Sequence, residues 1–404
     1  MLIAAIAAQR CFGASYANAT TRIVPSISVS ERYDTNVFLA PRSFVPTGRQ
    51  AWDLVSTIAP VVEVINTSHQ AQTNITAGVN GNVFAYNRDL SFIGTNVDAS
   101  SKLDGWIGKL IPGAKLRIAE TFRFTPEPPG FITGGKPSPT ADAFARGIQA
   151  TRANTYINIV STDGSYALSR TVSLRGDYSY STFKAGSIFI QPGSGLSFFN
   201  TNMHQWSVGP SLRMTRGDTL SLNYQSTTMT LSGAGTVSSF TGRGISAQYS
   251  KVTPAWTVRV SGGATLLEEG NRLFFSGKLD LIKDYDPSTK MTLTASRGIA
   301  PAFFGAPGGG ALISTTAEVS VDRRVSKSLS FRAAGNYGYN ETAPEKVTTF
   351  NSISLNAMLT YALTRTTSAS LSYNYTYFKV SQPEQLPFLV ERSLVTLSIT
   401  AKWY

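Results

Sequence analysis

The sequence lacks the features on which a disulfide-stabilised, metal-binding or helical membrane protein depends. Cysteine occurs once, at Cys11, so a disulfide framework within the chain is impossible. Histidine occurs twice, and neither His69 nor His204 has cysteine or acidic neighbours at metal-ligand spacing. No apolar run approaches the ~18–20 residues that a membrane-spanning helix needs. We therefore expect no metal, no cofactor, no catalytic residues and no helical membrane domain.

Charge is also scarce. Charged residues make up 15% of the 404 residues, whereas soluble domains usually carry about 25%. The charges are unbalanced, with 36 Lys+Arg against 24 Asp+Glu and a net charge of +12. Hydrophobic residues at 42% and aromatic residues at 11% argue against disorder. Low charge, many aromatic rings and abundant serine, threonine and asparagine predict one large all-β structure that uses lipid as its solvent.

From residue 22 onward the dominant pattern is an alternation of apolar and polar residues. In Ser368–Phe378, leucine and tyrosine at positions 371, 373, 375 and 377 alternate with serine, asparagine and threonine. Strict alternation predicts a strand with one apolar and one polar face. The same pattern recurs in Thr219–Met229, Ser328–Tyr339 and Asn351–Tyr361.

Short turns and longer Gly- or Pro-rich connections alternate along the chain, as periplasmic turns and extracellular loops do in an outer-membrane barrel. The count predicts a transmembrane antiparallel up-and-down β-barrel of about 18 strands, with 16 and 20 as alternatives. Val55–Asn66, Phe92–Leu103 and Lys115–Phe124 alternate poorly. In the last of these, Glu120 falls on the lipid face unless a bulge intervenes or the residue lies above the bilayer.

Both ends of the chain carry export signals. Residues 1–19 are predicted to be a secretory signal peptide, because the apolar run Leu2–Ala8 precedes the small-x-small pattern Ala17-Asn18-Ala19. The charged region that normally begins a leader is missing, so the start of the leader can be incomplete. Residues 20–404 are then one outer-membrane barrel domain. The terminal strand, which ends at Trp403-Tyr404, resembles the aromatic signal that the barrel-assembly machinery recognises.

The second face of each strand is expected to line a wet lumen, because a charge on the lipid face near the midplane costs roughly 2–4 kcal/mol. A barrel of this size is wide enough for an aqueous channel, and a net positive wall favours anions. An alternative is that inward Arg–Asp pairs satisfy one another. The connections 126–150 and 302–311 are candidates for constricting loops. The inward basic residues, our candidate pore-lining set, are Arg175, Arg213, Arg259, Lys278 and Arg332.

One segment carries a family resemblance. Ser26–Phe38 reads SISVSERYDTNVF, a strand that runs into a polar turn at Asp34-Thr35-Asn36. A Ca²⁺ site there is an alternative to ordinary turn chemistry. The segment resembles the opening strand of a family of outer-membrane β-barrel porins that is often associated with exopolysaccharide export in Gram-negative bacteria, and Ile58-Ala59-Pro60 is similar to a proline-bearing segment of that family. The resemblance implies an outer-membrane barrel and supplies no catalytic residues.

Three functions follow from these observations. The first is an outer-membrane channel in a Gram-negative bacterium, as the port for a secreted polysaccharide, with an anionic substrate suggested by the basic lumen. The alternatives are a general diffusion porin for small anions and a structural or adhesion barrel that acts through its loops. An enzyme is disfavoured, because no Ser/His/acid set is visible. The expected partners are outer-membrane lipid, periplasmic polysaccharide-export components and the barrel-assembly machinery, and no nucleic acid.

Overall fold

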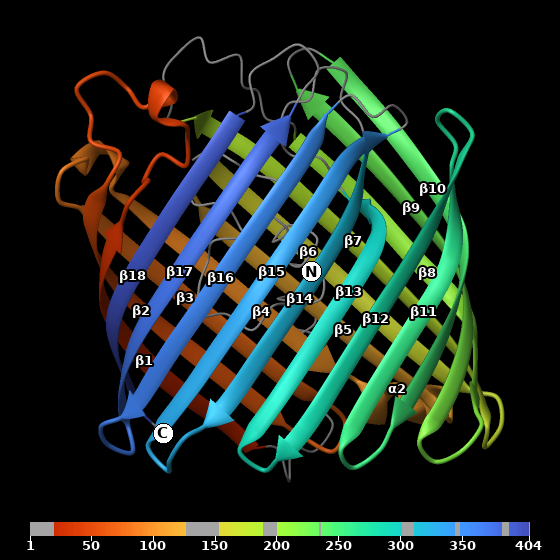
Figure 1. Ribbon diagram of the computed structural model, residues 1–404. Helices are drawn as coiled ribbons and strands as arrows, with labels where there is room; N and C mark the ends of the chain where they lie inside the picture. Colours follow the sequence, from red (N-terminus) through yellow and green to blue (C-terminus); the bar gives the residue numbers. More distant parts are fainter. Residues whose placement is uncertain are drawn as a thin grey trace.

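The computed structural model is one closed antiparallel barrel of eighteen strands (Figure 1). The structure describes residues 20–126, 153–188, 200–233, 236–300, 311–343, 348–381 and 388–403. The predicted leader 1–19 and the loop 126–150, after its first residue, lie outside them. The strands are β1 (Thr20–Asp34), β2 (Asp53–Thr67), β3 (Gln72–Phe84), β4 (Phe92–Lys102), β5 (Ala114–Thr125), β6 (Ala153–Ala167), β7 (Val172–Ile188), β8 (Asn200–Arg213), β9 (Asp218–Gly233), β10 (Thr236–Val252), β11 (Trp256–Leu267), β12 (Arg272–Asp286), β13 (Thr289–Ala300), β14 (Ala311–Arg324), β15 (Leu329–Ala343), β16 (Thr349–Ala362), β17 (Thr367–Ser381) and β18 (Phe388–Lys402).

Each strand pairs with its neighbours in sequence, and β1 closes the barrel by pairing with β18. This arrangement confirms the predicted up-and-down barrel and its strand number. The three segments that alternate poorly in sequence form β2, β4 and β5. Closure removes the two outer edges that an open sheet of these strands would have, as a sheet that crosses a membrane requires.

The outer surface of the barrel is apolar. Val29 of β1 lies opposite Ile58 of β2 and Ile399 of β18, and all three side chains are about half exposed. Exposed leucine, valine and isoleucine side chains recur at every second position around the wall. A band of this kind has lipid as its natural environment, because the alternation puts every second side chain outside.

Aromatic rings mark the two ends of this apolar band. At the extracellular end, Trp52 contacts Tyr86 edge-on, with ring centroids 4.7 Å apart, and lies 6.1 Å from Tyr33. At the periplasmic end, the ammonium of Lys283 faces the rings of Trp256 and Tyr285 at 4.4 and 4.1 Å. Amphipathic rings at both rims are the girdles of an outer-membrane barrel.

The connection after β4 is longer than the other periplasmic connections. It forms the helix α2 (Asp104–Leu110), which lies at the periplasmic end of β5 (Figure 1). Its apolar residues Trp106, Ile107 and Leu110 follow helical spacing, and Gly105 approaches residue 70 so closely that a side chain would clash with the backbone there. No helix among the described residues is long and apolar enough to cross a membrane.

Glu120 faces outward. The register runs unbroken through β5, where Glu120 pairs with Ala99 of β4 and Val160 of β6, so the bulge considered from the sequence does not form. Glu120 lies at the middle of β5, and its partner Val160 lies at the middle of β6. A position above the bilayer therefore does not account for the outward carboxylate either.

Candidate functional site: the lumen wall and its two mouths

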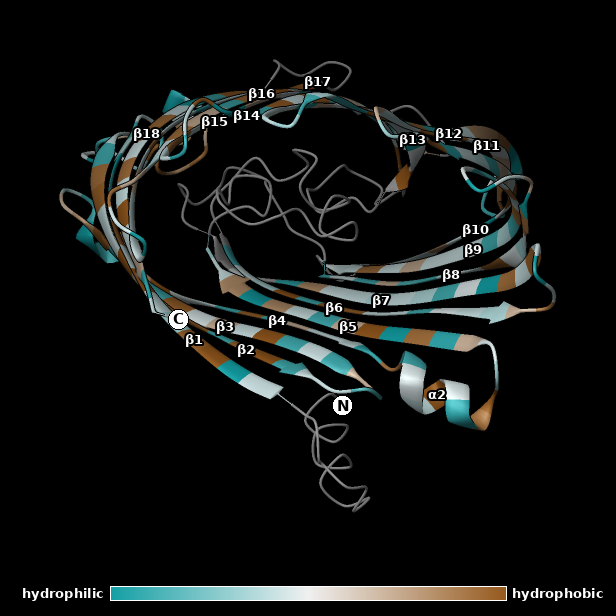
Figure 2. Cartoon of the chain, turned by 90° about the horizontal axis from the view of Figure 1, so that it is seen from below, coloured by the Kyte–Doolittle hydropathy of each residue, from teal (hydrophilic) through white to brown (hydrophobic). Residues whose placement is uncertain are grey.

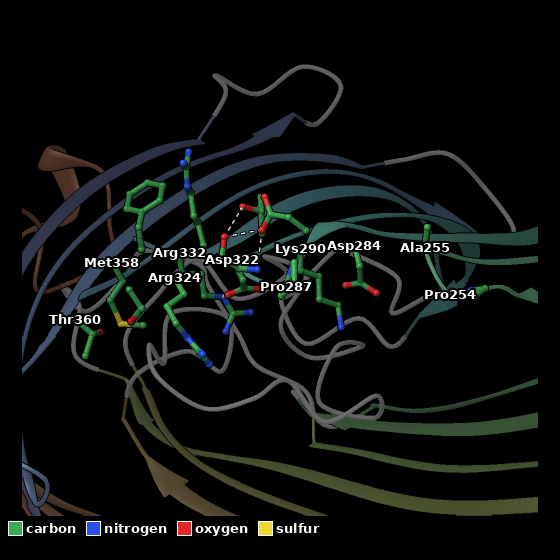
Figure 3. Close-up of a pocket in the computed structure, with 16 residues that line it drawn as sticks. Pro254, Ala255, Asp284, Pro287, Lys290, Asp322, Arg324, Arg332, Met358 and Thr360 are labelled. Atoms are coloured by element: carbon green, nitrogen blue, oxygen red, sulfur yellow. Dashed lines mark hydrogen bonds and ion pairs between the residues drawn. The ribbon is translucent and has the colours of Figure 1, made fainter. Parts of the chain in front are cut away.

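The charged face of the wall points into the lumen. Figure 3 shows Lys290, Asp322 and Arg324 projecting from β13 and β14 into the barrel. Asp322 lies opposite both Lys290 and Arg332 in the register, so these residues share one face. The register then assigns every other strand position to the inside or the outside, because side chains alternate between the faces.

The structure places all five predicted pore-lining residues on the inner face. Arg175 lies on β7, Arg213 on β8, Arg259 on β11, Lys278 on β12 and Arg332 on β15. They are spread around the wall and do not form one cluster. Together they form part of a distributed basic lining.

Two of the five are neutralised by carboxylates on the same wall. The ammonium of Lys278 lies 3.2 Å from Asp280, and the guanidinium of Arg332 lies 3.5 Å from Asp322. Within the described ranges, Arg175, Arg213 and Arg259 form no ion pair. Both alternatives considered from the sequence therefore occur, with some inward bases paired and others left open to solutes.

The inward bases concentrate at the periplasmic mouth. In the described part of the chain, eleven inward Lys and Arg residues and six inward acids lie within four residues of the periplasmic end of their strand. This excess of positive charge surrounds the entrance from the periplasm. The bases are Arg22, Lys102, Lys115, Arg117, Arg175, Arg213, Arg259, Lys290, Arg324, Arg332 and Lys402, and the acids are Glu63, Asp98, Asp163, Asp284, Asp286 and Asp322.

A pocket of about 860 Å³ lies in this basic mouth, between the ends of β12 to β16 (Figure 3). Lys290 and Arg324 enter it, and neither forms an ion pair with a described residue. Asp284 also lines the pocket, while Asp286 accepts hydrogen bonds from the backbone and side chain of Ser288. The pocket thus offers free cations beside hydrogen-bond acceptors, a suitable combination for a hydroxylated anion.

The extracellular mouth is built differently, around a buried ion pair that joins the first and last strands. The Nε of Arg392 donates to the Asp34 carboxylate at 3.0 Å, and a second guanidinium nitrogen contacts the same carboxylate. Their side chains are 1% and 0% exposed. Asp34 also accepts from the backbone N–H of Asn36, whose side chain donates to the carbonyls of Ala40 and Glu391. The turn chemistry expected at Asp34 and Asn36 is present. The guanidinium of Arg392 lies against the Asp34 carboxylate, where Ca²⁺ had been considered as an alternative.

The segment after β1 packs on the inner wall beside this ion pair. Val37 and Phe38 are buried against the inward side chains Val55 of β2 and Phe84 of β3. A second buried carboxylate, Asp53, accepts hydrogen bonds from the backbone of residues 86 and 87 and from the side-chain amide of residue 87. These contacts attach the first two extracellular connections to the lumen wall.

Sequence reasoning missed Arg392 and Asp53. Arg392 alternates inward between Val390 and Leu394, and a lone inward arginine on the last strand, opposite the end of the first, was the available signal. His204, by contrast, lies on the outer face, where its Nδ1 lies 2.9 Å from the hydroxyl of Tyr178. No group of three or more His, Cys, Asp or Glu residues suited to a metal occurs in the described ranges.

A comparison with known protein families finds a match for the C-terminal part of the barrel. Residues 275–402, from β12 to the end of β18, match the family described as "Putative beta-barrel porin 2". The chain is an outer-membrane β-barrel whose C-terminal strands are similar to this porin family. The family match, the apolar outer band and the two aromatic girdles agree on a channel in the outer membrane of a Gram-negative bacterium. No curated protein matches the chain.

Solved structures with a similar trace are distant in sequence. The ferric enterobactin receptor PfeA of Pseudomonas aeruginosa, as its Q482A mutant, aligns with a TM-score of 0.46 and 9% identity over 96% of this chain and 82% of the receptor. OccK2 (OpdF) of the same organism aligns with a TM-score of 0.45 and 10% identity, over 94% and 98% of the two chains. OccAB4 of Acinetobacter baumannii aligns with a TM-score of 0.42 and 10% identity, over 95% and 98%.

Proposed function

We propose that this porin conducts anionic solutes and serves as the outer-membrane port for a secreted anionic polysaccharide. The observation that carries the proposal is the excess of inward bases at the periplasmic mouth. A polymer that leaves the cell meets this mouth first. Positive charge on a low-dielectric wall raises the local concentration of anions and speeds their entry.

The rest of the wall suits a hydroxylated polymer. Between the basic mouth and the outer connections the inner face carries mainly serine, threonine, asparagine and glutamine, as on β17 with Ser370, Ser372, Asn374 and Thr376. Such side chains exchange hydrogen bonds with sugar hydroxyls and with water without a strong preference, so a chain can slide past them. The resemblance of Ser26–Phe38 to porins associated with exopolysaccharide export supports the same substrate class.

Conductance in planar bilayers tests the proposal. We expect a reversal potential that shows anion preference, and block by an oligogalacturonate at lower concentration from the periplasmic side than from the extracellular side. The triple variant Arg175→Gln/Arg213→Gln/Arg259→Gln should weaken that block at least tenfold. The matched control is Lys379→Gln, which removes one positive charge from the outer face of β17 and should leave the block unchanged.

Three outcomes reject parts of this proposal. Cation preference rejects an anionic substrate of any size. Anion preference without block by the oligogalacturonate leaves a general diffusion porin for small anions. A sealed barrel that still binds cells or surfaces indicates a structural or adhesion role.

A further inference from the structure

The periplasmic turns repeat one hydrogen-bonding motif. Four of the turns at the lower end of the barrel in Figure 1 begin with serine or threonine, whose hydroxyl oxygen accepts the backbone N–H groups two and three residues later at 2.9–3.2 Å. Serine and threonine stabilise turns in this way because the hydroxyl takes the place of a backbone acceptor. The four turns are residues 169–172, 215–218, 326–329 and 364–367.

The second residue of each of these four turns is basic. The base is not needed to form a turn of this kind, because in residues 68–71 the hydroxyl of Ser68 accepts the same two N–H groups, at 3.3 and 3.0 Å, with His69 in the second position. The four bases are exposed, and none of them forms an ion pair with a described residue. They are Arg170, Arg216, Lys327 and Arg365.

An exposed apolar side chain lies directly before each turn. Strand parity places it on the outer face of the barrel, since Leu168 follows the outward Tyr166 by two positions and Met214 follows the outward Leu212 in the same way. Each turn therefore presents an outward apolar group and, two residues further, a cation at its tip. The apolar residues are Leu168, Met214, Val325 and Leu363, which are 50–59% exposed.

The neighbouring outward groups at this rim have the same character. The ammonium of Lys283 lies against the rings of Trp256 and Tyr285. Arg323 pairs in the register with Phe331, which is 37% exposed. Basic side chains beside aromatic and apolar ones at the end of a membrane-spanning strand are typical of the headgroup layer.

Helix α2 adds another amphipathic element at the same end of the barrel. Trp106 and Leu110 are 48% and 66% exposed, and Lys109, which precedes Leu110, is exposed as well. In Figure 2 the helix lies at the rim and does not cover the lumen. An exposed apolar helix surface with a nearby cation suits the boundary between headgroups and acyl chains.

The surface formed by the four turns is positive and occupies two sides of the barrel. Asp218 is the one carboxylate in these turns, and its oxygens accept hydrogen bonds from the hydroxyls of Thr215 and Tyr249 at 2.6 and 2.9 Å. Figure 2 shows β6 to β8 and β14 to β17 on opposite sides of the lumen. A lipid leaflet surrounds the barrel and reaches both sides, whereas a protein that docks on one side does not.

We propose that the four turns bind the phosphate groups of anionic phospholipids in the periplasmic leaflet. The acyl chains of that leaflet surround the outward apolar residue of each turn, and the phosphate layer lies at the level of the base. A cation close to an anionic membrane surface is attracted to it within a Debye length. This interaction belongs to the outer rim of the barrel and uses none of the inward bases of the proposed port.

Tryptophan quenching by brominated lipid tests the proposal. Trp403 is the reporter, because it is 50% exposed and because the N–H of Lys402 donates to the carbonyl of Thr366, next to Arg365, at 2.8 Å. The other four tryptophans are replaced by phenylalanine. The protein is placed in phosphatidylcholine vesicles that contain brominated phosphatidylglycerol or, at the same mole fraction, brominated phosphatidylcholine. At about 0.01 M salt, phosphatidylglycerol should associate at Trp403 about three- to fivefold more strongly than phosphatidylcholine.

Two variants and a second reporter identify the groups responsible. Replacing all four turn bases by glutamine keeps the hydroxyls that form the turns and should lower the ratio of association constants to about one. Replacing the three arginines by lysine keeps the charge and should keep the ratio. Trp52 at the extracellular end, made the only tryptophan in the same way, should not respond to the glutamine substitutions. The variants are Arg170→Gln/Arg216→Gln/Lys327→Gln/Arg365→Gln and Arg170→Lys/Arg216→Lys/Arg365→Lys, and heat-modifiable migration on gels confirms that they are folded.

The proposal is overturned if the two lipids associate equally at Trp403, a result that would leave the turn tips to an acidic periplasmic protein. It is also overturned if the glutamine variant keeps the preference, or if the lysine variant loses it, because the attraction would then not depend on these charges. Neither conductance nor polymer block enters these measurements, so failure of this proposal and failure of the proposed function are distinguishable.

Discussion

Replacing Arg392 by leucine should destabilise the barrel by about 3–5 kcal/mol, because the substitution leaves the carboxylate of Asp34 buried without its cation. Both side chains are almost completely shielded, at 1% and 0% exposure. Among the described residues, only the backbone N–H of Asn36 would remain as a hydrogen-bond donor to that carboxylate. The loss is measured by urea titration of the barrel folded in short-chain phosphatidylcholine vesicles, with tryptophan fluorescence as the signal.

A double variant separates the energy of the pair from the cost of the unpaired charge. Asp34→Asn/Arg392→Leu removes both charges, so it should be more stable than Arg392→Leu by about 1–3 kcal/mol. Arg49→Leu is the matched control, because Arg49 and Asp89 form an exposed pair with side chains that are 40% and 54% exposed. That substitution should cost less than about 1 kcal/mol.

The reasoning is refuted if Arg392→Leu loses no more stability than Arg49→Leu. It is also refuted if the loss in the double variant equals the sum of the losses in Asp34→Asn and Arg392→Leu measured singly. A functional readout follows from the same contacts. Because the ion pair and Asn36 attach the first extracellular connection to the wall, Arg392→Leu should also raise single-channel conductance or make it noisier. Unchanged conductance would show that this connection does not restrict the outer mouth.

Three further changes probe the wall. Gly209→Ala should cost about 1–3 kcal/mol in the same titration, because its Cβ would lie 1.8 Å from the carbonyl oxygen of Leu222, whereas Gly262→Ala, with no atom within 4 Å, should be tolerated. Glu120→Leu should stabilise the barrel by about 1 kcal/mol, since it removes an outward carboxylate from mid-strand, and a loss of stability would indicate a polar partner at that face. Lys283→Ala should cost about 0.5–1 kcal/mol through loss of its contact with two aromatic rings, and an unchanged midpoint would contradict that role.

The sequence was sufficient to recognise a strand and its boundaries where each face of that strand keeps the same environment along its length. Strands β16 and β17 have lipid on one side and a polar lumen on the other, so their alternation is strict and their boundaries are readable. Strand β5 was harder to recognise because Glu120 interrupts its apolar face. The inward assignment of the bases needed only parity, whereas the closed barrel followed from the number of strands and from the alternation of short and long connections.

The outer mouth was not predictable in the same way. Asp34 and Arg392 are 358 residues apart, and their contact exists only because the barrel closes between β1 and β18. Val37 and Phe38 follow the end of β1, and nothing local shows that they fold back onto the lumen wall. The pairing of β12 with β13 ends at Gly277 and Arg297, and this is equally hidden in the sequence, because Ile299 alternates as a lipid-facing residue would although it packs against an apolar cluster of inward side chains.

In the proposed function the basic mouth acts through a shared electrostatic field, which distinguishes it from a single binding site. The bases lie on strands all around the barrel, and several, including Arg175 and Arg213, are exposed to the lumen. Their fields overlap across the opening when the Debye length is about 10 Å, at 0.1 M salt, and are confined to the wall when it is about 3 Å, at 1 M. Anion preference should therefore fall steeply between these salt concentrations. A preference that persists at 1 M would instead place selectivity in a local site, for which the pocket with Lys290 and Arg324 is the best candidate.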